Sequence, residues 1–154
     1  MNGLRTADCV LRTGVAAILL LGVGCKAPDE GPTPWEIVHG TAALAASKAV
    51  HPDSLTQLAS YPTRTGTITV ADDSGVAGWI RLTAIDTAFF TGTLTDDGSG
   101  LLVTLTGLTP GEYTVITSGS FPDTYALLST AILTSDVTGD PTPEQYRIYW
   151  EFHR

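Results

Sequence analysis

The chain has 154 residues, of which 43% are hydrophobic and 16% charged, so it suits one modest domain and is too apolar for disorder throughout. Its formal net charge of −8 argues against binding to nucleic acid, which needs clustered Lys and Arg, and against electrostatic docking on anionic lipid. Both cysteines, Cys9 and Cys25, lie near the N-terminus. The rest of the sequence therefore predicts no intrachain disulfide and no thiolate metal site.

Residues 1–24 have the pattern of an export signal. Arg5 and Arg12 give a positively charged start, and an uncharged apolar run occupies 14–24. This run of 11 residues is too short to span a bilayer as a helix, which takes roughly 20 residues. It suits the hydrophobic segment of a signal peptide instead.

The segment Leu21-Gly-Val-Gly-Cys25 resembles the processing site of bacterial lipoproteins, in which small residues precede a cysteine that is acylated and becomes the mature N-terminus. Gly24 occupies the small position, whereas Gly22 stands where these signals usually carry Leu. The resemblance implies that 1–24 is a lipoprotein signal peptide. It also implies that acyl chains on Cys25 attach the exported protein to a lipid bilayer.

Other outcomes for this segment are a plain secretory signal, cut near Gly24 or after Ala27, and an uncleaved anchor. By the same resemblance, Asp directly after the acylated cysteine would favour the inner membrane. Lys26 stands there instead, which is compatible with the outer membrane in a cell that has one. We therefore expect the mature protein in the cell envelope, anchored by lipid.

The next two segments are predicted to be a tether and a short helical region. Residues 25–34 contain three prolines, which favour a stiff, extended spacer. In 35–64, apolar residues recur at helical intervals from Trp35 to Ala49, and Asp53 is a candidate N-cap for a second short helix. His39 and His51 lie in this region without partners at ligand spacing, so they predict no metal site.

From residue 65 the sequence is rich in Thr, and turn signals recur every 8–12 residues or so, which is typical of an all-β sandwich. The last segment alternates regularly, and its apolar set is expected to face the core: Tyr146, Ile148, Trp150 and Phe152. Seven strands are expected, at about 65–71, 78–86, 88–95, 101–106, 112–118, 125–134 and 145–153.

Five short motifs lie in 66–118: Gly66-Thr-Ile-Thr-Val70, Asp73-Ser-Gly75, Val76-Ala-Gly78, Thr95-Asp-Asp-Gly98 and Gly107-Leu-Thr-Pro-Gly-Glu-Tyr-Thr-Val115. Together they resemble the carboxypeptidase-regulatory-like, transthyretin-like repeat family, whose modules are Ig-like sandwiches of cell-surface and envelope proteins. Trp79 departs from this pattern, because the family usually has a small residue there. The resemblance implies a mainly β fold, with one seven-stranded, antiparallel Ig-like β-sandwich over 65–154.

The Pro110-Gly111 pair predicts a type II turn, in which Gly111 takes positive φ. Tyr113 is then expected to pack toward the core while its hydroxyl finds a backbone partner, as in other sandwich corners.

No known catalytic motif occurs in the chain, and 65–154 contains a single histidine, His153, beside the terminus. We therefore predict no catalytic residue, no cofactor and no enzymatic activity. A small hydrolase remains a third hypothesis, and it would need a cleft that holds His153 beside Ser or Asp.

Carboxylates are paired in three loops: Asp72 with Asp73, Asp96 with Asp97, and Asp136 with Asp140. Oxygen ligands in loops suit Ca²⁺, but aspartate is also a common turn former. We predict turn formation and no metal site.

Five aromatic residues are candidates for a glycan-stacking face: Trp35, Trp79, Phe89, Phe90 and Tyr149. The two candidates for ligand stacking are Trp79 and Tyr149, which would have to lie exposed and coplanar on one face. The leading hypothesis is a membrane-anchored, non-enzymatic binding or structural module with an unknown envelope protein or glycan as partner. The alternative is a carbohydrate-binding module of the cell envelope.

Overall fold

The computed structural model describes residues 32–117 and 123–154. Within them it contains one short helix and ten strands, and all strand pairs are antiparallel. The elements are α1 (Pro34–Val38), β1 (Gly40–Val50), β2 (Gln57–Ser60), β3 (Thr65–Val70), β4 (Gly75–Arg81), β5 (Thr87–Asp96), β6 (Leu101–Thr106), β7 (Glu112–Thr117), β8 (Thr124–Ser129), β9 (Leu133–Ser135) and β10 (Glu144–His153).

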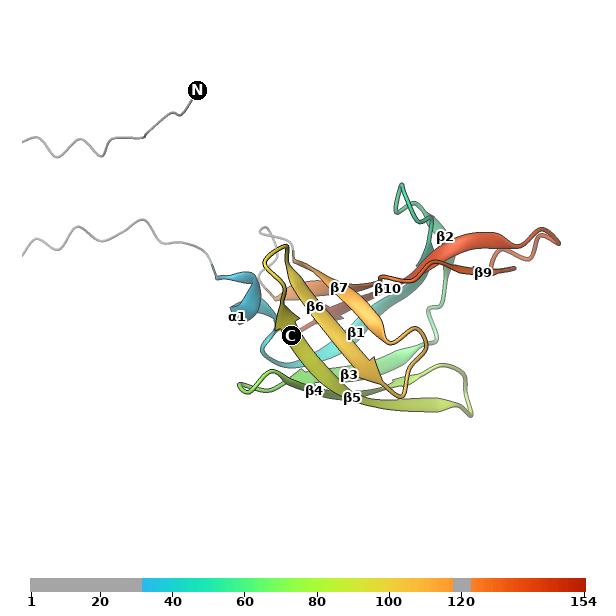
Figure 1. The fold of residues 1–154 in the computed structure, drawn as a ribbon. Coiled ribbons are helices and arrows are strands. Elements are labelled where there is room, and N and C mark those ends of the chain that lie inside the picture. The colour runs from blue at the N-terminus through green and yellow to red at the C-terminus, as the bar shows by residue number, and fades with distance from the viewer. Residues whose placement is uncertain (1–31, 118–122) are drawn as a thin grey trace, which may run out of the picture.

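Eight of these strands form a closed barrel, in the order β1-β3-β4-β5-β6-β7-β8-β10 (Figure 1). The barrel closes where β1 pairs with β10, from Ala43 opposite His153 to Val50 opposite Arg147. The two remaining strands lie outside the barrel, where β2 pairs with the end of β1 and β9 with the start of β10. They lengthen the sheet at the barrel end far from α1.

The prediction of a mainly β fold is confirmed, but the seven-stranded Ig-like sandwich is wrong. All seven expected strands are present as β3–β8 and β10, with the expected 125–134 strand divided into β8 and β9. The motifs that suggested a sandwich lie in hairpins, and sandwiches and barrels share such hairpins. Closure depends on β1, which lies outside the segment assigned to the sandwich.

The helical prediction for 35–64 is also wrong beyond α1, because β1 and β2 occupy much of this segment. A β-bulge between Leu44 and Ala46 shifts the register of β1 against β10. It therefore changes which alternate residues face inward: Ala42 is buried before the bulge, and Ser47 and Ala49 are buried after it. The seven-residue spacing from Ala42 to Ala49 then imitates two helical turns.

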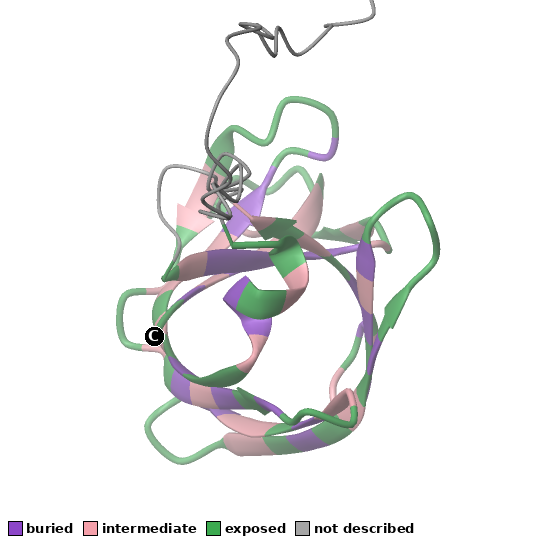
Figure 2. Ribbon diagram, turned by 90° about the vertical axis from the view of Figure 1, so that its left-hand side faces the viewer, coloured by how far each residue is buried: buried purple, intermediate pink, exposed green. Residues whose placement is uncertain are grey.

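Helix α1 lies across one mouth of the barrel (Figure 2). Thr33 caps it through a capping box with Glu36, and Ile37 and Val38 join the hydrophobic core. The last residue fastens the helix to β10, since the guanidinium of Arg154 donates to the backbone oxygens of Glu36 and His39. Both ends of the described chain therefore meet at this mouth.

Packed side chains fill the barrel interior. Tyr113 stacks on Trp150 with ring centroids 5.1 Å apart, and Tyr125 stacks on Phe152 at 5.7 Å. The inward orientation expected for Trp150 and Phe152 is confirmed. Tyr146 and Ile148 are only half-buried. Tyr146 lies where β10 runs past the barrel and pairs with β9, whereas Ile148 packs against the edge of the core.

The turn before β7 differs from the expected type II turn. Gly107 takes positive φ (99°) and Gly111 does not, and the Thr109–Pro110 peptide bond is cis. The prediction for Tyr113 is nevertheless confirmed, because its ring is fully buried and its hydroxyl donates to the backbone oxygen of Pro110 at 2.8 Å. Burial of this phenol raises its pKa.

Two inward-facing glycines allow neighbouring strands to curve tightly around the core. A Cβ at Gly78 would meet the ring of Phe90, its partner on β5, at 2.6 Å. A Cβ at Gly92 would overlap the backbone oxygen of Thr104 on β6. Glycine at such positions is the usual means of bending strands into a barrel, and an aromatic ring covers the gap over Gly78.

Candidate functional site

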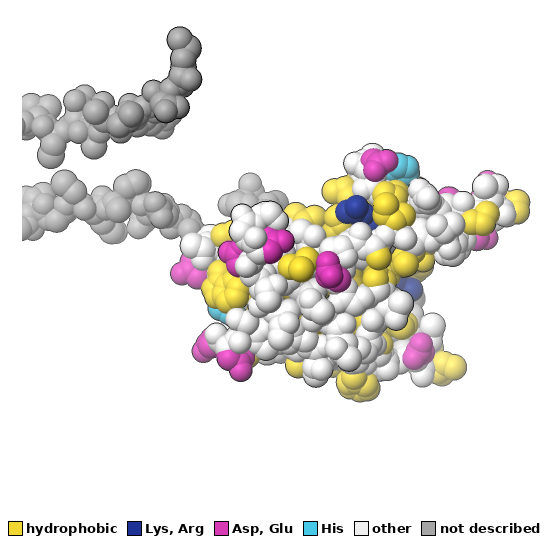
Figure 3. Space-filling model, viewed as in Figure 1, with side chains coloured by type: hydrophobic (Ala, Val, Ile, Leu, Met, Phe, Trp, Pro, Cys, Tyr) yellow, Lys and Arg dark blue, Asp and Glu magenta, His cyan; other side chains and the backbone are white. Residues whose placement is uncertain are grey.

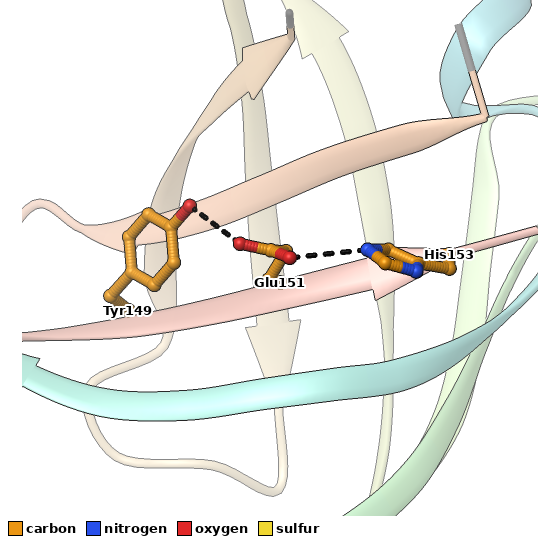
Figure 4. Close-up of polar contacts among 3 residues, drawn as sticks. All are labelled: Tyr149, Glu151 and His153. Atoms are coloured by element: carbon orange, nitrogen blue, oxygen red, sulfur yellow. Dashed lines mark hydrogen bonds and ion pairs between the residues drawn. The ribbon is translucent and has the colours of Figure 1, made fainter. Parts of the chain in front are cut away.

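The outer face of β10 carries three polar side chains in a row, Tyr149, Glu151 and His153 (Figure 4). They point outward because the intervening residues, Trp150 and Phe152, are buried in the core. The carboxylate of Glu151 joins the three. The Tyr149 hydroxyl donates to its Oε2 at 3.2 Å, and its Oε1 lies 3.1 Å from Nε2 of His153.

These side chains line a depression of about 380 Å³ on the outer face of β7, β8 and β10, called here the β10 depression. Its other lining residues include Ile116, Thr124 and Ala126. Ala126 lies between Ile116 and Glu151 in the strand register, so its short side chain leaves space at the centre. The depression therefore combines an apolar side with one carboxylate and one imidazole.

Tyr149 is held as a neutral phenol. Burial raises its pKa above the ordinary value, and the charge of Glu151 and the hydrogen bond to it raise the pKa further. Lys48, its partner across the β1–β10 closure, places its amino group 5.6 Å from the ring centroid. Tyr149 is therefore a hydrogen-bond donor and a packing surface, and it is a poor base.

The contacts of His153 bear on the hydrolase hypothesis. A nucleophilic hydroxyl must lie within hydrogen-bonding distance of the base that activates it. Thr124 is the cross-strand partner of His153, yet among the described residues the imidazole hydrogen-bonds only to Glu151. The hydrolase hypothesis asks for Ser or Asp beside His153, and within 32–117 and 123–154 the hydrogen-bonded neighbour of His153 is Glu151.

Replacing Glu151 with Gln is expected to lower the pKa of Tyr149 toward its ordinary value. Gln keeps the size of the side chain but removes the negative charge that opposes ionisation of the phenol. The pKa should stay above the ordinary value, because burial remains its largest cause. An NMR titration of labelled tyrosine Cζ atoms measures the change. Glu144→Gln is the control, since Glu144 bonds to Val137 and Thr138 instead. An unchanged pKa in Glu151→Gln would contradict the contact.

A second surface lies on the outer face of the β4–β5 hairpin. Trp79 and Phe89 are directly opposite each other in the ladder. Both point outward, because their neighbours Ile80 and Phe90 are buried, and Phe89 is 72% exposed. Trp79 is half-buried on the outer wall of the barrel, and Phe89 beside it is the ring that faces solvent.

Arg81 and Thr87 form the next outward pair along the same two strands. With Trp79 and Phe89 they line a shallow groove of about 430 Å³, called here the aromatic groove. Within the described part of the chain, Arg81 forms no ion pair. Its guanidinium donors are therefore available at the edge of the groove.

The structure does not bring Trp79 and Tyr149 onto one face, as the sequence interpretation required. Trp79 is on β4 and Tyr149 on β10, and β3 and β1 lie between these strands in the barrel. Phe89 is the true neighbour of Trp79, and only the strand register could identify it. The other weighed aromatics are structural, since Phe90 is in the core and Trp35 packs edge-on against His39 at 5.2 Å.

Five of the six paired aspartates accept turn hydrogen bonds in the structure. Asp97 accepts three hydrogen bonds, from the backbone of Ser99 and Gly100 and from the Ser99 hydroxyl, and these bonds lower its pKa. Four further aspartates accept backbone N–H bonds within their own loops, namely Asp73, Asp96, Asp136 and Asp140. Figure 3 shows the acidic side chains dispersed over the visible face. No group of three or more metal-ligating side chains occurs in 32–117 and 123–154.

The remaining sequence candidates bring no further site. His51 accepts a hydrogen bond from the backbone N–H of Asp53 at 3.3 Å, within its own loop. Cys25, its signal peptide at 1–24 and most of the tether at 25–34 lie outside the described residues. No helix in the described part of the chain is long and apolar enough to span a membrane.

Comparisons with protein-family models, with curated proteins and with solved structures find no match to this chain.

Proposed function

We propose that the chain is an exported lipoprotein of the cell envelope, anchored through acylated Cys25, whose barrel serves as a non-enzymatic binding module. The charged start, the short apolar run and the small residues before Cys25 support export and acylation. Several acyl chains on one cysteine would hold the protein on a bilayer, because each buried CH₂ contributes about 0.8 kcal/mol and a single chain binds only weakly.

The exposed aromatic groove is the observation that carries the binding role. The barrel interior is filled by its own side chains, so a ligand has to be recognised on the outside. A large aromatic side chain that is 72% exposed loses hydrophobic stabilisation unless a partner covers it. Trp79 and Phe89 side by side therefore favour recognition of a partner over a purely structural role.

The β10 depression supports a role without catalysis. The Glu151 carboxylate is shared between Tyr149 and His153 on the outer face of β10 (Figure 4). A general base needs a reacting proton within hydrogen-bonding reach, and catalysis gains most in a site that excludes water. We therefore assign no catalytic step to the residues that line this surface.

Mass spectrometry of the membrane fraction is expected to find an acylated peptide that begins at Cys25. Cys25→Ser should remove the modification and release the protein into the soluble fraction. Cys9→Ser is the matched control, since Cys9 precedes the cleavage site and its loss should leave the mature protein unchanged. Recovery of a soluble, unmodified mature protein from the parent chain would refute lipid anchoring.

A further inference from the structure

The aromatic groove has the size and the chemistry of a site for a sugar ring. Its volume of about 430 Å³ lies within the range of small-ligand pockets, roughly 300–1,000 Å³. A pyranose presents a flat C–H face bordered by hydroxyl groups. The C–H face would bury apolar area against Trp79 and Phe89. The hydroxyls would bond to the guanidinium of Arg81 and the hydroxyl of Thr87, which line the same groove.

We propose that the aromatic groove binds a neutral polysaccharide, an inference that rests on the binding role proposed above. The ligand is neutral because the chain carries a net charge of −8, which repels polyanionic glycans at long range. Arg81 contributes directed hydrogen-bond donors, and one cation does not offset that repulsion. A polymer with repeated rings suits an open groove on a strand face, where each ring can occupy the site in turn.

The groove is too small and its surroundings too polar for a stable protein interface. An aromatic side chain buries about 150–250 Å², so two of them fall well short of the roughly 800 Å² that each partner contributes to a standard interface. Among the outward neighbours of the groove in the strand register are three threonines, Thr65 opposite Arg81, Thr67 opposite Trp79, and Thr91 on β5, together with Ala77 opposite Thr91. Hydroxyl groups around two aromatic rings match a glycan better than an apolar protein patch.

The position of the groove agrees with capture of a ligand away from the anchoring membrane. The described chain begins beside α1, at one mouth of the barrel (Figure 1). Arg81 is the last residue of β4, and the register of β1, β3 and β4 puts this end of β4 away from α1. Ile85, in the loop that follows, is 98% exposed. A barrel attached through its α1 end would direct this loop and the groove beside it outward.

A glycan array tests the proposal. The full chain, kept in detergent, is applied to neutral glucans and chitooligosaccharides, and to polyuronates as the acidic comparison. We expect binding in the neutral arm, and we expect Trp79→Ala and Phe89→Ala each to weaken it about tenfold or more. Ile132→Ala is the matched control, because Ile132 is also an exposed apolar residue but lies outside the groove, and its binding should be unchanged. Circular dichroism of each variant confirms that the barrel is retained.

Three results would overturn the glycan proposal. The first is that the chain binds no glycan on the array. The second is that Trp79→Ala and Phe89→Ala leave binding intact. The third is that the chain binds only polyuronates and that Arg81→Gln abolishes this binding. A dimer in sedimentation that Phe89→Ala dissociates would likewise assign the groove to a second copy of the chain. None of these results alters acylation of Cys25, so a failure of the ligand assignment is distinguishable from a failure of the proposed lipoprotein function.

Discussion

A chain that begins at residue 65 is expected not to fold cooperatively. Residues 65–154 hold seven of the eight barrel strands, but they lack β1, which pairs with β3 on one side and β10 on the other. Its removal leaves two strand edges with unpaired backbone groups and opens the core that Ile37, Val38 and Ala42 help to fill. An independent sandwich over 65–154 would instead survive the truncation.

Urea denaturation followed by circular dichroism and by fluorescence measures this difference. The 65–154 chain should show no cooperative transition, with collapsed or aggregated material at all urea concentrations. A 32–154 chain is the control, because it keeps every described strand, and it should unfold in a single transition. A cooperative transition in the 65–154 chain would show that β1 is not required and that the closed barrel is wrong.

Gly92→Ala is expected to cost about 3 kcal/mol or more of the free energy of unfolding, an unusually large effect for one methyl group. Gly92 does not have positive φ, so backbone conformation does not forbid alanine. The added Cβ would overlap the backbone oxygen of Thr104 on β6. To relieve this overlap, β5 has to move away from β6 at the point where Gly92 pairs with Leu105. That movement would weaken the hydrogen bonds between the two strands and loosen the packing of the core.

Thr93→Ala is the control for this variant, because Thr93 is the next residue of β5 and faces solvent. It should change the free energy of unfolding by no more than about 1 kcal/mol, the span of β-strand propensities. Equilibrium urea denaturation of both variants gives the comparison. If Gly92→Ala were as mild as Thr93→Ala, the two strands could not approach each other as closely as the structure shows.

The strands of the barrel could be predicted well because their signals are local. Threonine-rich segments and recurring turn signals located β3–β8 and β10, and alternation placed Trp150 and Phe152 in the core. Strand β1 could not be predicted in this way. Its bulge between Leu44 and Ala46 reverses the alternation, and its alanines are strong helix formers that only pairing on both edges holds in a strand.

The two candidate sites also differ in how far the sequence could predict them. Alternation along β10 was enough to place Tyr149, Glu151 and His153 on one face, since they are two residues apart in a single strand. The aromatic groove needed more, because Phe89 meets Trp79 only through the register of the β4–β5 hairpin. The separation of Trp79 from Tyr149 followed from the order of strands around the barrel.

By itself, the sequence determined the strand-rich character of 65–154 and the inward orientation of Tyr113, Trp150 and Phe152, because each depends on neighbours a few residues apart. Only the tertiary structure decided that the sheet closes. Closure depends on hydrogen bonds between β1 and β10, about a hundred residues apart in the chain, and on glycines whose missing side chains let strands bend past one another. Which aromatic side chains share a surface follows from that closure.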